Sequence, residues 1–297
     1  MKILVIQARP GIGDMCLFLP FIHQIAKYNN SKITILTKER CQAKHLIIND
    51  PFIDEIIYIQ KKFNYKFFKY LRLKNFDCVY IFHYGFKFIL LSKFIGISNI
   101  FSYGVFKKNS NISQEPKKFL KKWFNKKRII YQCKIFFKKN NFNKNNIIIG
   151  IGGSGETKKW HIENYLKLIK KIISLKKKYT FLIAGGHYDL KNYLFLQKKL
   201  NYSKFISLCE MNISEAMKKI VSSKIYIGND TGFMHISGML GVKTYGLFGD
   251  TPTAYAEYNN IIKPIIPRGY SGIGHDSLAM NDIDVDLVFS KIKKEIS

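Results

Sequence analysis

The stretch that decides the fold is "GNDTGFMHISGMLGVKTYGLFGDT", residues 228 to 251. It follows an apolar run at 225–227 and places an acid, a hydroxyl and a glycine in a row before a short apolar helix. The pattern predicts that Gly241 ends this helix, that 242–248 form a second strand, and that a second polar turn follows at 249–251. A strand, a helix and a second strand in this order are typical of a parallel sheet covered by helices.

The same alternation runs through the rest of the chain. In the first half we expect strands at 3–6, 33–36, 56–59 and 78–82, and helices at 15–28, 41–48, 66–73 and 117–139. In the second half we expect strands at 147–151, 180–184, 205–208, 225–227 and 242–248, and helices at 162–175, 188–200 and 212–221. The strands are short, apolar and rich in Ile, as in sheets buried on both faces. The predicted fold class is α/β, with two Rossmann-like doubly wound domains facing a central cleft.

A polar segment without periodicity, "KKNNFNKNN" at 138–146, separates the two halves. We therefore expect an N-terminal domain at 1–140, a linker at 141–146 and a C-terminal domain at 147–280. An amphipathic helix is expected at 281–297, with packing back on the N-terminal domain as one option.

Composition narrows the class of protein. At 297 residues and 47% hydrophobic content the chain can bury two cores. Its five cysteines are scattered without a C-x-x-C pair, which argues against a metal centre or disulfide framework and fits a reducing compartment. The first residues enter a strand pattern at once, unlike a signal peptide. The most apolar window, 88–101, is interrupted by Lys93 and is shorter than the roughly 20 residues that a membrane span needs.

The net charge of +29 is concentrated between residues 61 and 139, where 20 Lys and Arg face two acids. Three explanations stay open: a compositional background rich in Lys, Asn and Ile, attraction to anionic lipid head groups, and nucleic acid binding. The third is the weakest because no helix-turn-helix, zinc-finger or RNP-type signature accompanies the charge.

Polar turns follow the strands of both halves. Asp230-Thr231-Gly232 would direct backbone amides and the positive end of a helix dipole at an anion, and Gly249-Asp250-Thr251 can wall the same site. The alternative is simple helix capping, with Asp230 or Thr231 as the N-cap, Gly241 as the stop and His235 as a packed histidine.

Two further loops carry candidate residues. In "QARPGIGDM", residues 7–15, Asp14 stands at a helix start and is either a cap or a general base. In "GIGGSGETKKW", residues 150–160, a flexible turn is followed by Lys158 and Lys159, either of which can offset charge on a phosphate or simply reflect the basic composition.

These motifs together resemble those of the family-nine glycosyltransferases, the heptosyltransferases of lipopolysaccharide core assembly. Asp230-Thr231-Gly232-x-x-His235 and Leu247-Phe248-Gly249-x-Thr251 match the C-terminal signature. Gly13-Asp14 matches the N-terminal motif, and Lys158-x-Trp160 matches the lysine motif of the second domain. The first loop departs from the family, with Arg9-Pro10-Gly11-Ile12 where Ser or Thr is usual. Residues after Tyr255, including "RGYSGIGHDS", match nothing assigned.

The resemblance implies a GT-B fold and an inverting, metal-independent transfer of heptose, with ADP-heptose or a similar nucleotide sugar as donor and no cofactor. It makes Asp14 the base on the acceptor hydroxyl, and it places Arg9 and Gly13 near the acceptor. Asp189 stands where the family commonly has a glutamate near the nucleoside. The implied donor-binding residues are Ser154, Lys158, Asp189, Asp230, Thr231, Gly232, His235 and Gly249.

The implied partners are a nucleotide sugar, a lipid-linked anionic saccharide acceptor and the inner face of the cytoplasmic membrane, where the protein would be peripheral; nucleic acid is not expected. A hexosyl- or N-acetylglucosaminyltransferase on the same scaffold and a non-catalytic basic surface-binding protein are the alternatives. Asp282-x-Asp284 resembles a metal motif, but it precedes the C-terminal helix, where acids complement the helix dipole.

Overall fold

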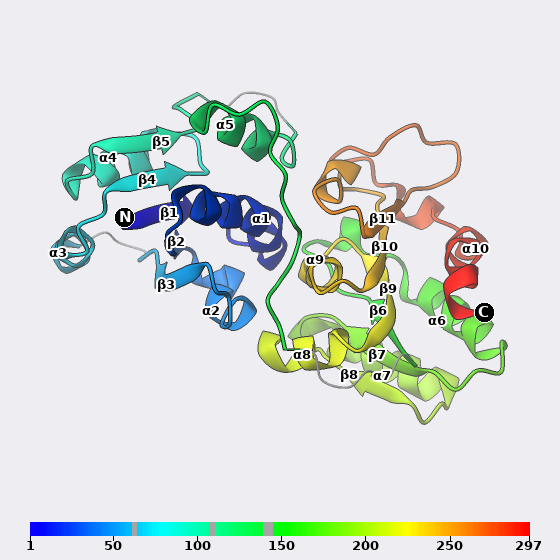
Figure 1. Cartoon of the computed structure of the whole chain (residues 1–297). Coiled ribbons are helices and arrows are strands. Elements are labelled where there is room, and N and C mark those ends of the chain that lie inside the picture. Colours follow the sequence, from blue (N-terminus) through cyan, green and yellow to red (C-terminus); the bar gives the residue numbers. More distant parts are fainter. Residues whose placement is uncertain (61–63, 107–110, 139–144) are drawn as a thin grey trace. The chain divides into compact units, whose positions relative to one another are not determined.

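The computed structural model describes residues 1–60, 64–106, 111–138 and 145–297. The chain divides into two compact units, Met1–Phe136 and Phe137–Ser297, and each is built on one parallel sheet (Figure 1). Most of the predicted linker at 141–146 lies outside the described residues, and Asn146 already begins a strand of the second unit.

The first unit has five parallel strands in the order β3-β2-β1-β4-β5. The strands are β1 (Ile3–Gln7), β2 (Ile33–Thr37), β3 (Ile53–Tyr58), β4 (Cys78–Ile81) and β5 (Asn99–Ser102). The helices are α1 (Ile12–Asn29), α2 (Ala43–Leu46), α3 (Tyr65–Leu73), α4 (Phe86–Phe94) and α5 (Glu115–Trp123).

Successive side chains of a strand point to opposite faces of the sheet, so their contacts show which helices cover which face. Leu4 and Val79 share a buried cluster with side chains of α3 and α4. On the opposite face Tyr80 meets Trp123 of α5, and Phe82, just beyond β4, meets Phe18 of α1. The first sheet is therefore covered by α3 and α4 on one face and by α1 and α5 on the other.

The second unit has six parallel strands in the order β11-β10-β9-β6-β7-β8. The strands are β6 (Asn146–Gly150), β7 (Thr180–Ala184), β8 (Phe205–Ser207), β9 (Ser223–Asn229), β10 (Lys243–Leu247) and β11 (Ile262–Ile265). The helices are α6 (Ile162–Ile173), α7 (Leu190–Leu200), α8 (Ile213–Ile220), α9 (Gly232–Met239) and α10 (Val285–Ile296).

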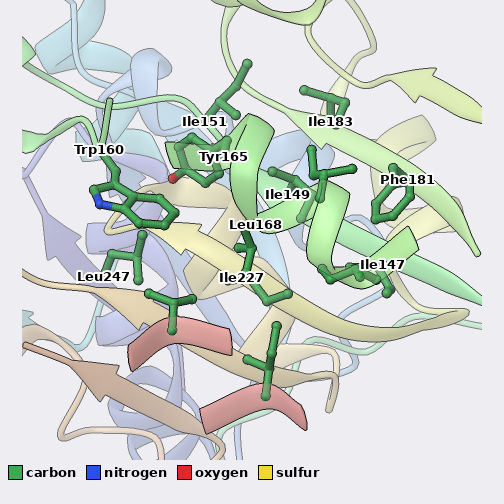
Figure 2. Packing of buried hydrophobic residues seen from close by; sticks show 14 of the residues in the cluster. Ile147, Ile149, Ile151, Trp160, Tyr165, Leu168, Phe181, Ile183, Ile227 and Leu247 are labelled. Carbon is green, nitrogen blue, oxygen red and sulfur yellow. The ribbon is translucent and has the colours of Figure 1, made fainter. Parts of the chain in front are cut away.

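The core of the second unit lies between its sheet and α6 (Figure 2). Tyr165 and Leu168 of α6 pack there with Ile147 and Ile227 of the sheet. Val288, Ile292 and Ile296 of α10 belong to the same buried cluster. The apolar side of the C-terminal helix is therefore part of the core of the second unit.

The predicted basic helix over 117–139 is wrong in length. The helix α5 ends at Trp123 because Asn125 adopts a left-handed conformation with φ 50°. The Lys126 amide then donates to the carbonyl of Lys121 at 3.0 Å, a pattern that closes a helix. The predicted helix at 41–48 is likewise only four residues, and α4, β5 and β11 were not predicted. Among the helices of the described ranges, none is long and apolar enough to cross a bilayer.

Candidate functional site

The predicted strand, turn and helix at 225–239 are confirmed. Thr231 is the N-cap of α9 in extended conformation, and the first turn of α9 follows directly. Amides of a first helical turn have no carbonyl partner within the helix, so they are available to a ligand. Gly241, with φ 82°, follows the end of α9 as the predicted left-handed stop.

His235 is enclosed within the second unit. Its Nε2 lies 3.2 Å from Oδ1 of Asp230, and its Nδ1 lies 3.1 Å from the Tyr258 hydroxyl. The rings of His235 and Tyr258 also stack, with centroids 5.6 Å apart. The side chain of Asp230 retains 12% exposure. Since His235 is buried, this arrangement orients Asp230 at the end of the strand.

Asn229 is a fully buried residue that sequence reasoning missed. Its Oδ1 accepts hydrogen bonds from the Trp160 amide at 3.1 Å and the Tyr165 hydroxyl at 2.8 Å. Its Nδ2 donates to the carbonyls of Ile151 and Gly152 at 3.1 and 2.8 Å. One side chain thus fastens both ends of the loop between β6 and α6 to the end of β9. The only signal in the sequence was an amide directly after an apolar strand.

Glycines at the strand ends of the second unit let backbone segments approach one another closely. Gly150 of β6 pairs with Gly228 of β9, and a Cβ on Gly228 would lie 2.3 Å from the Gly150 carbonyl oxygen. A Cβ on Gly249 would lie 2.4 Å from the Met280 amide nitrogen. The strand order changes direction between β6 and β9, and such a switch point is where ligands bind in doubly wound sheets.

The second polar turn lies close to the lysine loop. Asp250 is buried, and it accepts a hydrogen bond from the Leu278 amide at 2.9 Å. A hydrogen bond from the Thr157 side chain and the one from Leu278 hold the pKa of Asp250 below its usual value, against the effect of burial, with smaller contributions from Lys158 and His275. The segment 274–278, which sequence reasoning left unassigned, therefore packs against this turn.

Asp189 lies inside the second unit. Its Oδ2 accepts from the Gly186 amide at 2.9 Å, and its Oδ1 lies 3.2 Å from Nζ of Lys159, which also contacts Glu156 at 2.9 Å. Burial opposes the charged form of Lys159, but Glu156 and Asp189 raise its pKa overall. Lys159 is thus held by acids within the unit. Lys158 is half-buried, and Ser154 is exposed in the preceding turn.

In the first unit, Arg9, Gly13 and Asp14 come together after β1. Asp14 is the third residue of α1; its Oδ2 accepts from the Gly11 amide at 3.0 Å and its Oδ1 from Nε of Arg9 at 2.6 Å. Asp14 therefore caps the helix, while its side chain keeps 16% exposure and Arg9 keeps 42%. Capping and a role toward a ligand are compatible at this position.

Positive charge gathers at this edge of the first sheet, and sequence reasoning missed it. His83 is exposed, but partial desolvation lowers its pKa, and the charges of Lys38, Arg9 and Lys87 lower it further, against a backbone hydrogen bond with Tyr84. These residues follow β1, β2 and β4, neighbouring strands that end at the same edge. The arrangement suits an anionic ligand beside Asp14.

The acids near the C-terminal helix have structural partners. Asp284 is the N-cap of α10 and accepts from the Leu287 amide at 2.8 Å. Asp282 accepts from the Tyr270 hydroxyl at 2.6 Å, and Asp286 lies 2.7 Å from Nζ of Lys171. Asp284 and Asp286 also line a cavity of about 600 Å³ beside α6. Over the described ranges, no three or more His, Cys, Asp or Glu side chains are placed to hold a metal ion.

Two doubly wound sheets, each with polar turns at the carboxyl ends of the strands beside its switch point, are the architecture of GT-B glycosyltransferases. The model of glycosyltransferase family 9 (heptosyltransferase) matches residues 113–265, just over half of the chain. The chain belongs to this family and is a glycosyltransferase of the heptose-transferring type. No curated protein matches the chain in a sequence search.

Several solved structures have the same fold, and each superposition includes almost all of this chain and almost all of the other. The ADP-heptose lipopolysaccharide heptosyltransferase II of E. coli superposes with a TM-score of 0.80 at 18% identity, covering 100% of this chain and 98% of that one. A family 9 glycosyltransferase of Veillonella parvula gives 0.81 at 16% identity, covering 99% and 97%. The E. coli heptosyltransferase WaaC with ADP gives 0.80 at 12% identity, covering 99% and 100%. At these identities the likeness concerns the fold.

Proposed function

We propose that the chain transfers a heptose from ADP-heptose, with inversion and without a metal ion, to an anionic lipid-linked saccharide of the lipopolysaccharide core type. The observation that carries this proposal is the set of four loops at neighbouring strand ends of the second unit. They follow β6, β7, β9 and β10, and they surround the switch point. The family membership and the ADP bound in the structure of WaaC favour an adenine nucleotide sugar as the donor.

The donor diphosphate would lie against the first turn of α9. The amides around Thr231 and Gly232 and the Lys158 ammonium would supply positive charge to it, and Gly249 would allow close approach at the neighbouring turn. Asp230, oriented by His235, and exposed Ser154 are the polar side chains that would contact the sugar or diphosphate. Asp189 acts from within the unit by holding Lys159 and the Gly186 turn.

Asp14 would accept the proton of the acceptor hydroxyl. The acceptor oxygen then attacks the anomeric carbon, the bond from that carbon to the diphosphate oxygen breaks, and the nucleoside diphosphate leaves with the electron pair. A single displacement of this kind inverts the anomeric configuration. Arg9 fixes the orientation of Asp14, and Lys38, His83 and Lys87 attract the anionic acceptor. Such an acceptor places the protein at the cytoplasmic face of the inner membrane as a peripheral enzyme.

Calorimetric titration with ADP-heptose, UDP-N-acetylglucosamine and a UDP-hexose tests the donor. We expect saturable binding of ADP-heptose at least about tenfold tighter than either UDP sugar, and a loss of about tenfold in Lys158→Ala, in the range of a hydrogen bond to a charged group. A preference for a UDP sugar would replace the donor by that of the hexosyl- or N-acetylglucosaminyltransferase alternative. Absence of binding to all three would overturn the proposal.

A further inference from the structure

The helix α4 is apolar on two opposite faces. Phe88 and Leu91 point into the buried cluster of the first unit. Phe86, Leu90 and Phe94, spaced four residues apart, lie together on the other face and are 60%, 49% and 72% exposed. A short surface helix normally presents polar residues to water, so an apolar outer face calls for a partner.

The neighbouring helix α3 extends this surface. Phe68 of α3 and Phe94 of α4 are in edge-to-face contact, with ring centroids 6.4 Å apart. Tyr65 and Leu73 of α3 are 78% and 73% exposed. The two helices cover the same face of the first sheet, and Figure 1 shows them on the side of the unit away from α5.

The charge on these helices has one sign. The exposed residues Lys66, Lys69 and Arg72 of α3 and Lys87 and Lys93 of α4 are all basic, and neither helix contains an acid. Long basic side chains can keep their ammonium groups at the level of lipid phosphates while their stems and the adjacent aromatic rings enter the apolar layer. Each such cation is attracted to an anionic surface.

We infer that the outer face of α3 and α4 docks on an anionic lipid bilayer, with Phe86, Leu90 and Phe94 inserting at the interface and Lys66, Lys69, Arg72 and Lys93 binding head groups. This inference rests on the proposed function only in that the acceptor is lipid-linked. Both helices begin at the carboxyl edge of the sheet, because α3 follows β3 and α4 follows β4. Docking along the two helices holds that edge, with Asp14 and His83, beside the membrane in which a lipid-linked acceptor is anchored.

The helix α5 provides the contrast that makes this face specific. Its exposed residues are Lys118, Lys121 and Lys122, but its apolar side chains Leu120 and Phe119 are buried or half-buried. It also covers the opposite face of the sheet. A purely electrostatic contact would use either face, whereas apolar insertion requires α4.

Co-sedimentation with vesicles of phosphatidylcholine containing about 30% phosphatidylglycerol tests the inference. We expect the triple variant Phe86→Gln, Leu90→Gln, Phe94→Gln to lower the partition coefficient roughly 10- to 100-fold, from the apolar area it withdraws. The matched control Ile130→Gln, Leu194→Gln replaces exposed apolar residues elsewhere and should change it less than about twofold. A charge control, Lys118→Gln, Lys121→Gln, Lys122→Gln, should cost several-fold less than Lys66→Gln, Lys69→Gln, Lys93→Gln on the docking face.

Equal sedimentation of the parent and the α4 triple variant, both shown to be folded by circular dichroism, would overturn the inference. So would a parent protein that ignores vesicles but forms a dimer that the triple variant abolishes, because the occupant would then be a second copy. Transfer to a delipidated, soluble acceptor should be unchanged in the triple variant. If no variant transfers heptose but vesicle binding follows the expected order, the proposed function fails while the docking surface stands.

Discussion

The two units share one architecture but equip their strand ends differently. In the second unit the loops are fixed by buried groups: Asn229 makes four hydrogen bonds, and Gly228 permits contact that any side chain would prevent. In the first unit the corresponding edge carries partly exposed charges, with Arg9 paired to Asp14 beside His83.

This difference matches the kinds of ligand that the two units are proposed to bind. A nucleotide diphosphate has a fixed shape, and a rigid array of amides binds it without reorganisation. A lipid-linked saccharide is long and anionic, so flexible charged side chains can attract it and adjust to it. Loss of a residue in the second unit should therefore affect stability and donor binding together, whereas loss in the first should affect turnover or acceptor binding alone.

The largest effect is expected from Asp14→Asn. If Asp14 accepts the acceptor proton, kcat should fall roughly 10²- to 10⁴-fold, the usual contribution of a positioned acid–base group. Donor affinity should be unchanged because Asp14 belongs to the other unit. Steady-state kinetics and donor titration on the same preparation measure both. Near-normal turnover in a folded variant would leave Asp14 as a helix cap only.

The next effect concerns the buried amide of the second unit. Asn229→Ala removes four hydrogen bonds and leaves the amide and carbonyl groups of the β6–α6 loop without this partner. We expect the free energy of unfolding to fall by about 2–4 kcal/mol and the donor Kd to rise with it. Urea unfolding followed by fluorescence measures the first quantity. The free energy of unfolding of the exposed control Asn260→Ala should stay within about 0.5 kcal/mol of the parent. An equal loss in both variants would contradict the role of Asn229 in holding the β6–α6 loop.

The strands and their polar turns could be predicted because buried parallel strands leave a strong apolar signal and small polar residues mark their ends. Thr231 as N-cap and Gly241 as stop were both within reach of this logic. The helix α4 was missed because its apolar residues occupy two faces, which removes the periodic signal. The helix α5 was predicted too long because lysine favours helices, while a single left-handed Asn125 ended it.

The site was predictable only as a set of loops. Asp14, Lys158 and Asp230 stand out because charged residues next to glycines after strands are conspicuous. Nothing local distinguishes Asn229 from an ordinary cap, since its role depends on Trp160 and Tyr165, which are distant in sequence. His83 and Lys38 gain their meaning only when the sheet order places β2 and β4 on either side of β1.

A smaller effect is expected from pH in the first unit. The pKa of His83 lies below its usual value because of partial desolvation and the positive charges of Lys38, Arg9 and Lys87. A bound anionic acceptor would neutralise these charges and raise that pKa, so binding takes up a proton. Acceptor affinity should then be highest below the pKa of the free protein and weaken as pH rises through that of the complex. Between pH 8 and 6 we expect the acceptor KM to fall about two- to fivefold.

The variant His83→Gln provides the control for this titration. It should remove the part of the pH dependence that belongs to the protein, leaving only the ionisation of the acceptor itself. The donor KM should show no comparable trend in the parent, because His83 belongs to the first unit. If the acceptor KM has the same pH dependence in the parent and in the variant, the anionic group of the acceptor does not bind beside His83.

The smallest effect, none at all, is expected from chelation. In the proposed site the diphosphate charge is met by the first amides of α9 and by Lys158, so a divalent ion has no charge left to neutralise. Asp284 and Asp286, which resemble a metal motif with Asp282, are occupied in capping α10 and in pairing with Lys171. Initial rates of heptose transfer should therefore be equal, within about 20%, with and without excess EDTA. If EDTA abolishes transfer, Mn²⁺ restores it, and Asp282→Asn with Asp284→Asn prevents that restoration, the second unit uses a metal ion and its fixed amides are insufficient for the donor. Restoration that survives these substitutions would locate the ion elsewhere and still defeat the metal-free mechanism.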